Sequence, residues 1–169
     1  MNISYLKKQT LWHVVLVDFV LLVAACCVPT LSHLLAVPLY QLSPMLLILL
    51  AGMLLVRDHR NAYILAVLLP WVSMLAVGMP TMPKAFCMTA EFVVVVFVAS
   101  KLLPLAKRFV GSLGVMVSAI LCGKMVYYLL KALIIAPAVL VTTPIYIQAL
   151  SVLGAALLFA AFNRRLGEF

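Results

Sequence analysis

The sequence predicts an all-α integral membrane protein, a six-transmembrane-helix bundle with its N- and C-termini in the cytoplasm. Three observations predict it: the overall hydrophobicity, the length of the apolar runs and the placement of the basic residues. Of 169 residues, 67% are hydrophobic and 9% are charged. A soluble domain is about 45–50% apolar and about 25% charged. This chain therefore has more apolar surface than folding in water can hide, and lipid must cover it.

Six apolar runs are candidates for crossing the bilayer, which takes about 20 mostly apolar residues. The second run is the weakest, because its uninterrupted apolar part, 45–56, is short for a crossing. The spans leave no room for a soluble domain, so one membrane domain, 1–169, is expected. The predicted spans are 11–35, 39–56, 61–77, 83–103, 109–136 and 144–162.

The basic residues predict the orientation. Six spans place both termini on one side, together with nine lysines and arginines, whereas the other side has only Lys84. Cytoplasmic loops of membrane proteins are enriched in Lys and Arg, so both termini are expected in the cytoplasm. The predicted location is the bacterial cytoplasmic (inner) membrane. The net charge of +8 then reflects orientation and does not indicate nucleic-acid binding.

A lipoprotein signal is an alternative interpretation of the first span. Lys7 and Lys8 precede an apolar run that ends in Val-Ala-Ala-Cys at 23–26, the general pattern of a secretory signal. Asp18 lies inside the apolar run and argues against a signal. Losing this span would also scatter the basic residues over both sides.

Prolines distinguish the two halves of the membrane. In the predicted topology eight of the nine prolines lie in the outer half, and only Pro104 lies on the cytoplasmic side. Irregular backbone at membrane depth is tolerated where it is buried in protein or lines a wet cavity. Several of these prolines fit ordinary turns between spans, but Pro29 and Pro70 lie within spans and are expected to kink or interrupt them. The asymmetry indicates a pocket open to the outside.

Four ionisable residues lie within spans, where such groups usually face the bundle interior or water. Lys124 and Lys131 share a face of the fifth span, with Tyr127 and Tyr128 on the turn between them. Lys84, Met88 and Glu91 share a face of the fourth span in the same way. The four intramembrane residues are Asp18, Glu91, Lys124 and Lys131.

These two faces overlap in depth, so Glu91 is expected to pair with Lys124 or Lys131. The arrangement is compatible with a ligand pocket and equally with a structural ion pair that holds the bundle together. Asp18 has no evident partner in the sequence. His33, near the outer end of the first span, is a candidate for the edge of a pocket.

The sequence does not indicate catalysis. It has no Walker glycine loop, HExxH or GxSxG motif, and its four acidic residues are few for metal or phosphoryl chemistry. The four cysteines lack the spacing of a metal site and are expected to be small buried hydrophobes. We expect no enzyme activity, no cofactor and no bound metal.

The start of the fourth span carries a patterned segment, residues 77–91 (VGMPTMPKAFCMTAE). It resembles the signature of the substrate-binding S components of energy-coupling factor (ECF) vitamin transporters, where a Gly-Met-Pro-x-x-Pro turn leads into a helix with Met and Glu at this spacing. Residues 43–52 are similar to the second span of that family. Residues 122–127 are similar to a fifth-span motif, with Lys124 where arginine is common.

The resemblance implies a six-helix bundle that binds a water-soluble vitamin or precursor in its outward half and delivers it inward. Its implied partners are an ECF coupling membrane subunit and two ATPase subunits. The family pattern carries over to Glu91, Lys124 and Tyr127 as substrate-binding residues, with Met82 and Met88 in the pocket wall. Together with the residues taken from the sequence pattern, the candidate substrate-binding set is Glu91, Lys124, Tyr127, Lys131, Met82, Met88, Tyr128 and His33, and the candidate docking residues are Ala24 and Ala25.

Two other functions remain open at this point. One is a non-transport membrane scaffold for cell-shape or cell-wall machinery, which would bind partners through its spans and have no pocket. The other is a small oligomeric exporter, in which Asp18 or Glu91 would be the central acidic group.

Overall fold

The computed structural model describes residues 11–34, 43–106, 109–134 and 144–165. These residues are almost entirely helical, without a strand among them, which confirms the predicted all-α class. A short 3-10 turn, η2 (Leu103–Leu105), follows the fourth helix. The α-helices are α1 (Leu11–Leu34), α2 (Pro44–Val56), α3 (His59–Val77), α4 (Met82–Leu102), α5 (Phe109–Ile134) and α6 (Ile145–Arg165).

Five of the helices (α1, α3, α4, α5 and α6) are long and apolar enough to cross a membrane. Helix α2 is apolar but has only 13 residues, about 20 Å at 1.5 Å per residue, against about 30 Å of hydrocarbon. The predicted beginning of the second span, at residue 39, lies outside the described residues. The described part of the chain therefore has the character of a multi-pass membrane protein, with five helices long enough to span the bilayer.

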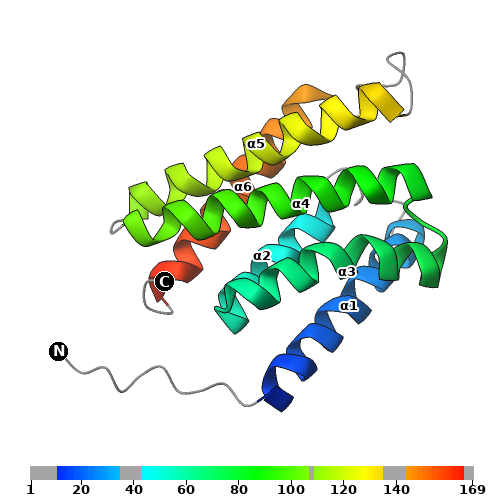
Figure 1. The fold of residues 1–169 in the computed structure, drawn as a ribbon, viewed down its shortest axis with the longest axis horizontal. Helices are drawn as coiled ribbons and strands as arrows, with labels where there is room; N and C mark the ends of the chain where they lie inside the picture. Colours follow the sequence, from blue (N-terminus) through cyan, green and yellow to red (C-terminus); the bar gives the residue numbers. More distant parts are fainter. Residues whose placement is uncertain (1–10, 35–42, 107–108, 135–143, 166–169) are drawn as a thin grey trace.

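The helices run up and down the bundle and define two ends, both visible in Figure 1. We call the end where α3 stops and α4 begins the Lys84 end; it lies on the right in Figure 1. The end where α2 stops and α3 begins is the Arg57 end. Helices α4 and α5 are antiparallel, so the last residues of α5 lie at the Lys84 end.

Helix α4 is central to the packing. It packs most extensively against α5 and next against α3, while α6 covers α5 and also touches α2. Helices α1, α2 and α3 contact one another on the other side of the bundle. The core is made by large side chains that are fully buried, including Leu49, Leu65, Val95, Ile120 and Phe159. Many other apolar side chains are exposed, as expected where lipid is the solvent.

The prolines inside helices do not end them. Helices α1 and α3 continue through Pro29 and Pro70, so neither proline ends its helix. A proline removes one backbone hydrogen bond, and in membrane helices neighbouring helices compensate for that loss. Pro70 is fully buried against such neighbours.

The turn between α3 and α4 contains the patterned segment of the sequence. Gly78 ends α3 with φ of 74°, a left-handed conformation that favours glycine. The Ser73 hydroxyl donates to the carbonyl oxygen of Met79 at 2.8 Å, which fastens the turn to the last part of α3. Helix α4 then begins after Thr81, with Pro83 in its first turn, where a missing N–H costs nothing.

Candidate functional site

A buried ion pair joins α4 to α5. The Lys124 Nζ lies 2.8 Å from Oε1 of Glu91, and the exposed fractions of the two side chains are 18% and 3%. The sequence predicted that Glu91 pairs with one of two lysines on α5, and the structure identifies that lysine as Lys124. A buried charge without a partner costs several kcal/mol of folding free energy. Glu91 and Lys124 therefore each compensate the charge of the other.

The pair is possible because α4 and α5 approach closely at Gly123. A Cβ atom at Gly123 would lie 2.6 Å from Val95 Cγ2 and 2.9 Å from the backbone oxygen of Glu91. Both distances are shorter than side chains tolerate, so only glycine allows this approach. Gly123 thereby sets the register in which Lys124, the next residue, reaches Glu91.

Two further contacts surround the Lys124 ammonium. The Nζ is 3.4 Å from the Ser43 hydroxyl oxygen, just before α2. It also lies 5.6 Å from the centroid of the Tyr127 ring, within the range of a cation–π interaction. The ammonium of Lys124 therefore connects α2, α4 and the next turn of α5.

The aromatic residues extend this group of side chains to α6. The Tyr127 and Tyr128 rings meet edge to face with centroids 5.4 Å apart. The Tyr128 hydroxyl donates to Oε1 of Gln148 on α6. We call the six residues Ser43, Glu91, Lys124, Tyr127, Tyr128 and Gln148 the polar cluster.

Three more predicted site residues lie nearer the Lys84 end of α4 and α5. Lys131 is 3% exposed, although it is charged and one turn beyond Tyr128. Met88 is partly buried and packs against the core. Met82, in the first turn of α4, is 66% exposed. Lys131 and Met88 are thus positioned inside the bundle, whereas Met82 lies at its surface.

The remaining predicted residues lie on α1. The side chain of His33 is outside the described part of the structure, so its predicted place at a pocket edge stays a prediction. Ala24 is exposed, whereas Ala25 is 1% exposed and faces the core. Of the two predicted docking residues, only Ala24 is available on the surface of the chain.

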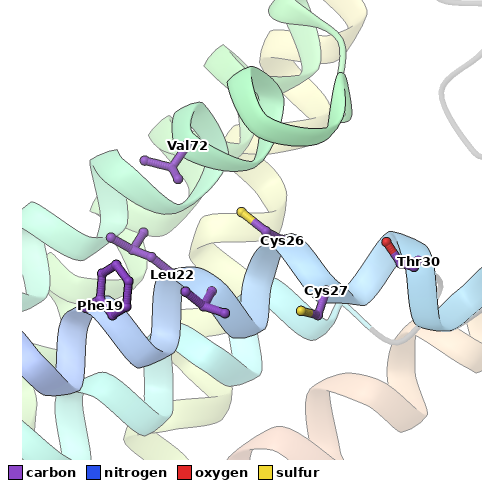
Figure 2. Close-up of a pocket in the computed structure, with 7 residues that line it drawn as sticks. Phe19, Leu22, Cys26, Cys27, Thr30 and Val72 are labelled. Carbon is purple, nitrogen blue, oxygen red and sulfur yellow. The ribbon is translucent and has the colours of Figure 1, made fainter.

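A groove of about 510 Å³ runs between α1 and α3 (Figure 2). In Figure 2, Phe19, Leu22, Cys26, Cys27 and Thr30 line it from α1, and Val72 faces them from α3. A site for a water-soluble ligand has a few convergent polar groups, and this lining is almost entirely apolar. The groove suits a lipid chain or a neighbouring helix, and the polar cluster is the better candidate for a soluble ligand.

A second polar contact between helices, partly buried, lies at the Arg57 end. The Asn61 amide on α3 donates to Oδ1 of Asp18 on α1 at 2.8 Å. Asn61 is 7% exposed. This contact supplies the partner that the sequence did not reveal for Asp18, and it fastens α1 to α3.

Sequence reasoning missed Ser43 and Gln148 as members of the polar cluster. The inward position of Gln148 could have been predicted, because a polar side chain in an apolar span usually faces the bundle interior. The contact of Ser43 with Lys124 could not have been predicted from a local pattern, since the two residues are 81 positions apart. Ser43 was visible only as part of the segment that resembles the ECF family.

The cysteines and acidic residues form no metal site in the described part of the chain. No group of three or more His, Cys, Asp or Glu side chains is close enough there to hold a metal ion. All four cysteines are free thiols. Cys87 is buried as expected, but Cys27 and Cys122 are exposed, because they lie on helix faces where lipid, rather than protein, covers a small apolar side chain.

No known protein family, no curated protein and no solved structure matches this chain.

Proposed function

We propose that this chain is the substrate-binding membrane subunit of an ECF-type importer. In this proposal it spans the inner membrane six times, with both termini in the cytoplasm and the Lys84 end outward. It captures a water-soluble vitamin or precursor there and delivers it inward with a coupling membrane subunit and two ATPase subunits. ATP hydrolysis belongs to the partner subunits.

The polar cluster is the observation that supports this proposal most strongly. A structural ion pair needs only two residues, but here Glu91 and Lys124 are accompanied by a hydroxyl group and two tyrosine rings. These groups converge from α4, α5, α6 and the residue before α2, between the middle of the bundle and its Lys84 end. Convergent polar groups of this kind are typical of a site that orients a polar ligand. Four of the residues that the family resemblance and the sequence pattern selected belong to it.

The exposed surface of α1 supports a partner subunit. Only 11% of the apolar window of α1 is buried, against 28–39% in the other four long helices. The groove on α1 includes the small side chains of Cys26, Cys27 and Thr30 beside larger apolar ones, and small side chains let another helix approach closely. Ala24 adds a further small exposed residue on the same helix.

Ligand binding by the isolated chain tests the proposal. The full chain, reconstituted in nanodiscs of neutral lipid without ATP, should bind one member of a panel of water-soluble vitamins saturably. Glu91→Gln and Lys124→Met should each weaken that binding at least about tenfold, as expected for loss of a charge-assisted contact. Ser118→Ala is the matched control, because Ser118 lies on α5 but is exposed, and its hydroxyl donates to the Gly114 carbonyl of the same helix.

Purification of the chain from its native membrane, together with its bound partners, separates the alternative functions. Copurification of ATPase subunits from the native membrane supports the importer. Cell-wall proteins without ATPases would instead support the scaffold, and proton-dependent efflux by the chain alone would support the exporter. If no vitamin binds to the wild-type chain at millimolar concentration, the importer proposal is wrong.

A further inference from the structure

Glu91 differs from the rest of the polar cluster in its burial. Its side chain is 3% exposed, whereas that of Lys124 is 18% exposed. The other members of the polar cluster are also partly exposed: Ser43, Tyr127, Tyr128 and Gln148. A molecule that enters the cluster from outside therefore meets Lys124 and the tyrosines, and does not meet Glu91.

Helix α5 covers Glu91. A Cβ atom at Gly123 would lie 3.3 Å from Glu91 Cγ and 2.9 Å from the backbone oxygen of Glu91, so the backbone of α5 lies directly against this residue. Helices α4 and α5 would have to separate here before a ligand atom could reach the Glu91 side chain. They make the most extensive contact between helices in the described part of the bundle and run side by side in Figure 1. Glu91 can therefore act on a ligand only through a neighbouring side chain.

Lys124 is that neighbour. The lysine side chain is a flexible four-carbon stem, and a binding group is effective when neighbouring contacts fix its position. The charge-assisted contact with Glu91, 2.8 Å long, holds the ammonium between the Ser43 hydroxyl and the Tyr127 ring. An ammonium group has three N–H donors. Glu91 takes one of them, and the contact with Ser43 is long at 3.4 Å, so the ammonium keeps the capacity to donate to an incoming acceptor.

We propose that Glu91 is a positioning residue that does not touch the ligand, and that the Lys124 ammonium donates a hydrogen bond to an acceptor atom of the ligand. The inference rests on the proposed function, because it assigns roles within the site where the importer would bind its substrate. The family resemblance implies that Glu91 contacts the substrate, and its burial gives it an indirect role instead. The substrate then carries a hydrogen-bond acceptor, such as a carbonyl oxygen or a ring nitrogen, on the part that enters the polar cluster.

A double-mutant cycle for ligand affinity tests these roles. The full chain in phosphatidylcholine nanodiscs is titrated with biotin, pantothenate, nicotinate, riboflavin and thiamine, and the cycle is measured with the probe that binds. Lys124→Met should weaken binding at least about tenfold and Glu91→Gln about tenfold. Because Glu91 acts through Lys124, the double variant Glu91→Gln/Lys124→Met should bind the probe no more weakly than Lys124→Met alone. A further loss of about tenfold in the double variant would show that Glu91 contacts the ligand, and would overturn the inference.

A protection experiment on the wild-type chain tests the contact of Lys124 without any substitution, so that poor folding of a variant does not decide the outcome. The rate at which acetic anhydride acylates each lysine is measured by mass spectrometry, with and without the bound probe. The probe should slow the acylation of Lys124 in proportion to the fraction of chains that hold it. Lys101 is the matched control, since it is an exposed lysine in the last turn of α4, outside the polar cluster, and its rate should not change.

The outcomes separate this inference from the proposed function. If a probe binds and its affinity depends on Glu91 even after Lys124 is replaced, the importer proposal stands and the positioning role is wrong. If a probe saturates the wild-type chain and leaves the acylation of Lys124 unchanged, the importer proposal stands and the ligand contact of Lys124 is wrong. If no probe binds to the wild-type chain, the importer proposal is wrong and this inference is overturned with it.

Discussion

The two ends of the bundle bury polar groups in different ways. At the Arg57 end, Asn61 donates to Asp18 between α3 and α1, and Asn163 donates to Ser112 between α6 and α5. Each of these hydrogen bonds joins only two helices. Between the middle of the bundle and the Lys84 end, Glu91 and Lys124 form an ion pair to which Ser43, before α2, and residues of α5 and α6 are joined. This polar cluster contains more polar groups than helix packing requires, and this excess supports a ligand site there.

Removing the cation of the polar cluster should have the largest effect. Lys124→Met leaves the Glu91 carboxylate buried without its partner, and breaking a buried pair costs about 3–5 kcal/mol. Glu91→Gln should cost less, because the Lys124 side chain is 18% exposed and retains other contacts, whereas that of Glu91 is 3% exposed. The change in the free energy of unfolding is measured for each variant in nanodiscs of neutral lipid.

The double variant Glu91→Gln/Lys124→Met is the control for this prediction. It removes both charges and should be more stable than Lys124→Met alone. Additive losses in the double variant would contradict a coupled pair.

The close approach of α4 and α5 should be the next most sensitive feature. Gly123→Ala places a methyl group 2.6 Å from Val95 Cγ2, and overpacking of this kind costs about 1–3 kcal/mol. Gly114→Ala on the same helix is the matched control, because nothing lies within 4 Å of its Cβ position. That change should be neutral or stabilise the protein by up to about 1 kcal/mol, as measured in the same unfolding assay. Equal effects of the two substitutions would contradict the close approach.

The Asp18–Asn61 contact should contribute less than the ion pair. Hydrogen bonds between membrane helices average about 0.6 kcal/mol in double-mutant cycles, with a maximum of about 1.7. A cycle of Asp18→Ala and Asn61→Ala should give a coupling energy in that range, and the Glu91–Lys124 cycle a larger one. Coupling energies in the reverse order would contradict the contrast between the two ends.

The cation–π contact of Tyr127 should have the smallest effect. Tyr127→Phe keeps a ring 5.6 Å from the Lys124 Nζ and should leave the free energy of unfolding nearly unchanged. Tyr127→Leu removes the ring and should lower the free energy of unfolding by about 0.5–1 kcal/mol. Unfolding measurements on the two variants distinguish the ring face from the hydroxyl group. A loss in Tyr127→Phe as large as in Tyr127→Leu would assign the contribution to the hydroxyl.

Much of the fold could be predicted from the sequence, because a helix that crosses lipid is a local feature. Hydropathy and length placed the ends of α1, α3, α4 and α5 within about two residues of those observed. The facing stripes of Glu91 and Lys124 followed from helical periodicity. Helix α2 was predicted to be the weakest span, and its described residues form a helix too short to cross the bilayer.

The candidate site could be predicted only in part. The sequence placed Glu91 at the depth of both Lys124 and Lys131, and periodicity cannot choose between residues on one face. Gly123 decides the choice, because its lack of a Cβ lets α4 and α5 meet in the register that pairs Glu91 with Lys124. No local pattern could have revealed Ser43, which reaches the cluster from a distant part of the chain.

By itself, the sequence determined that this chain belongs in lipid, where four of its six helices begin and end to within about two residues, and which residues share a helix face. These properties depend on composition and on the 3.6-residue period, both of which are local. Only the tertiary structure decided which faces meet: Glu91 with Lys124, and Asp18 with Asn61. These pairings depend on the packing of helices far apart in the sequence, which the close contact at Gly123 and the fit of the buried core determine.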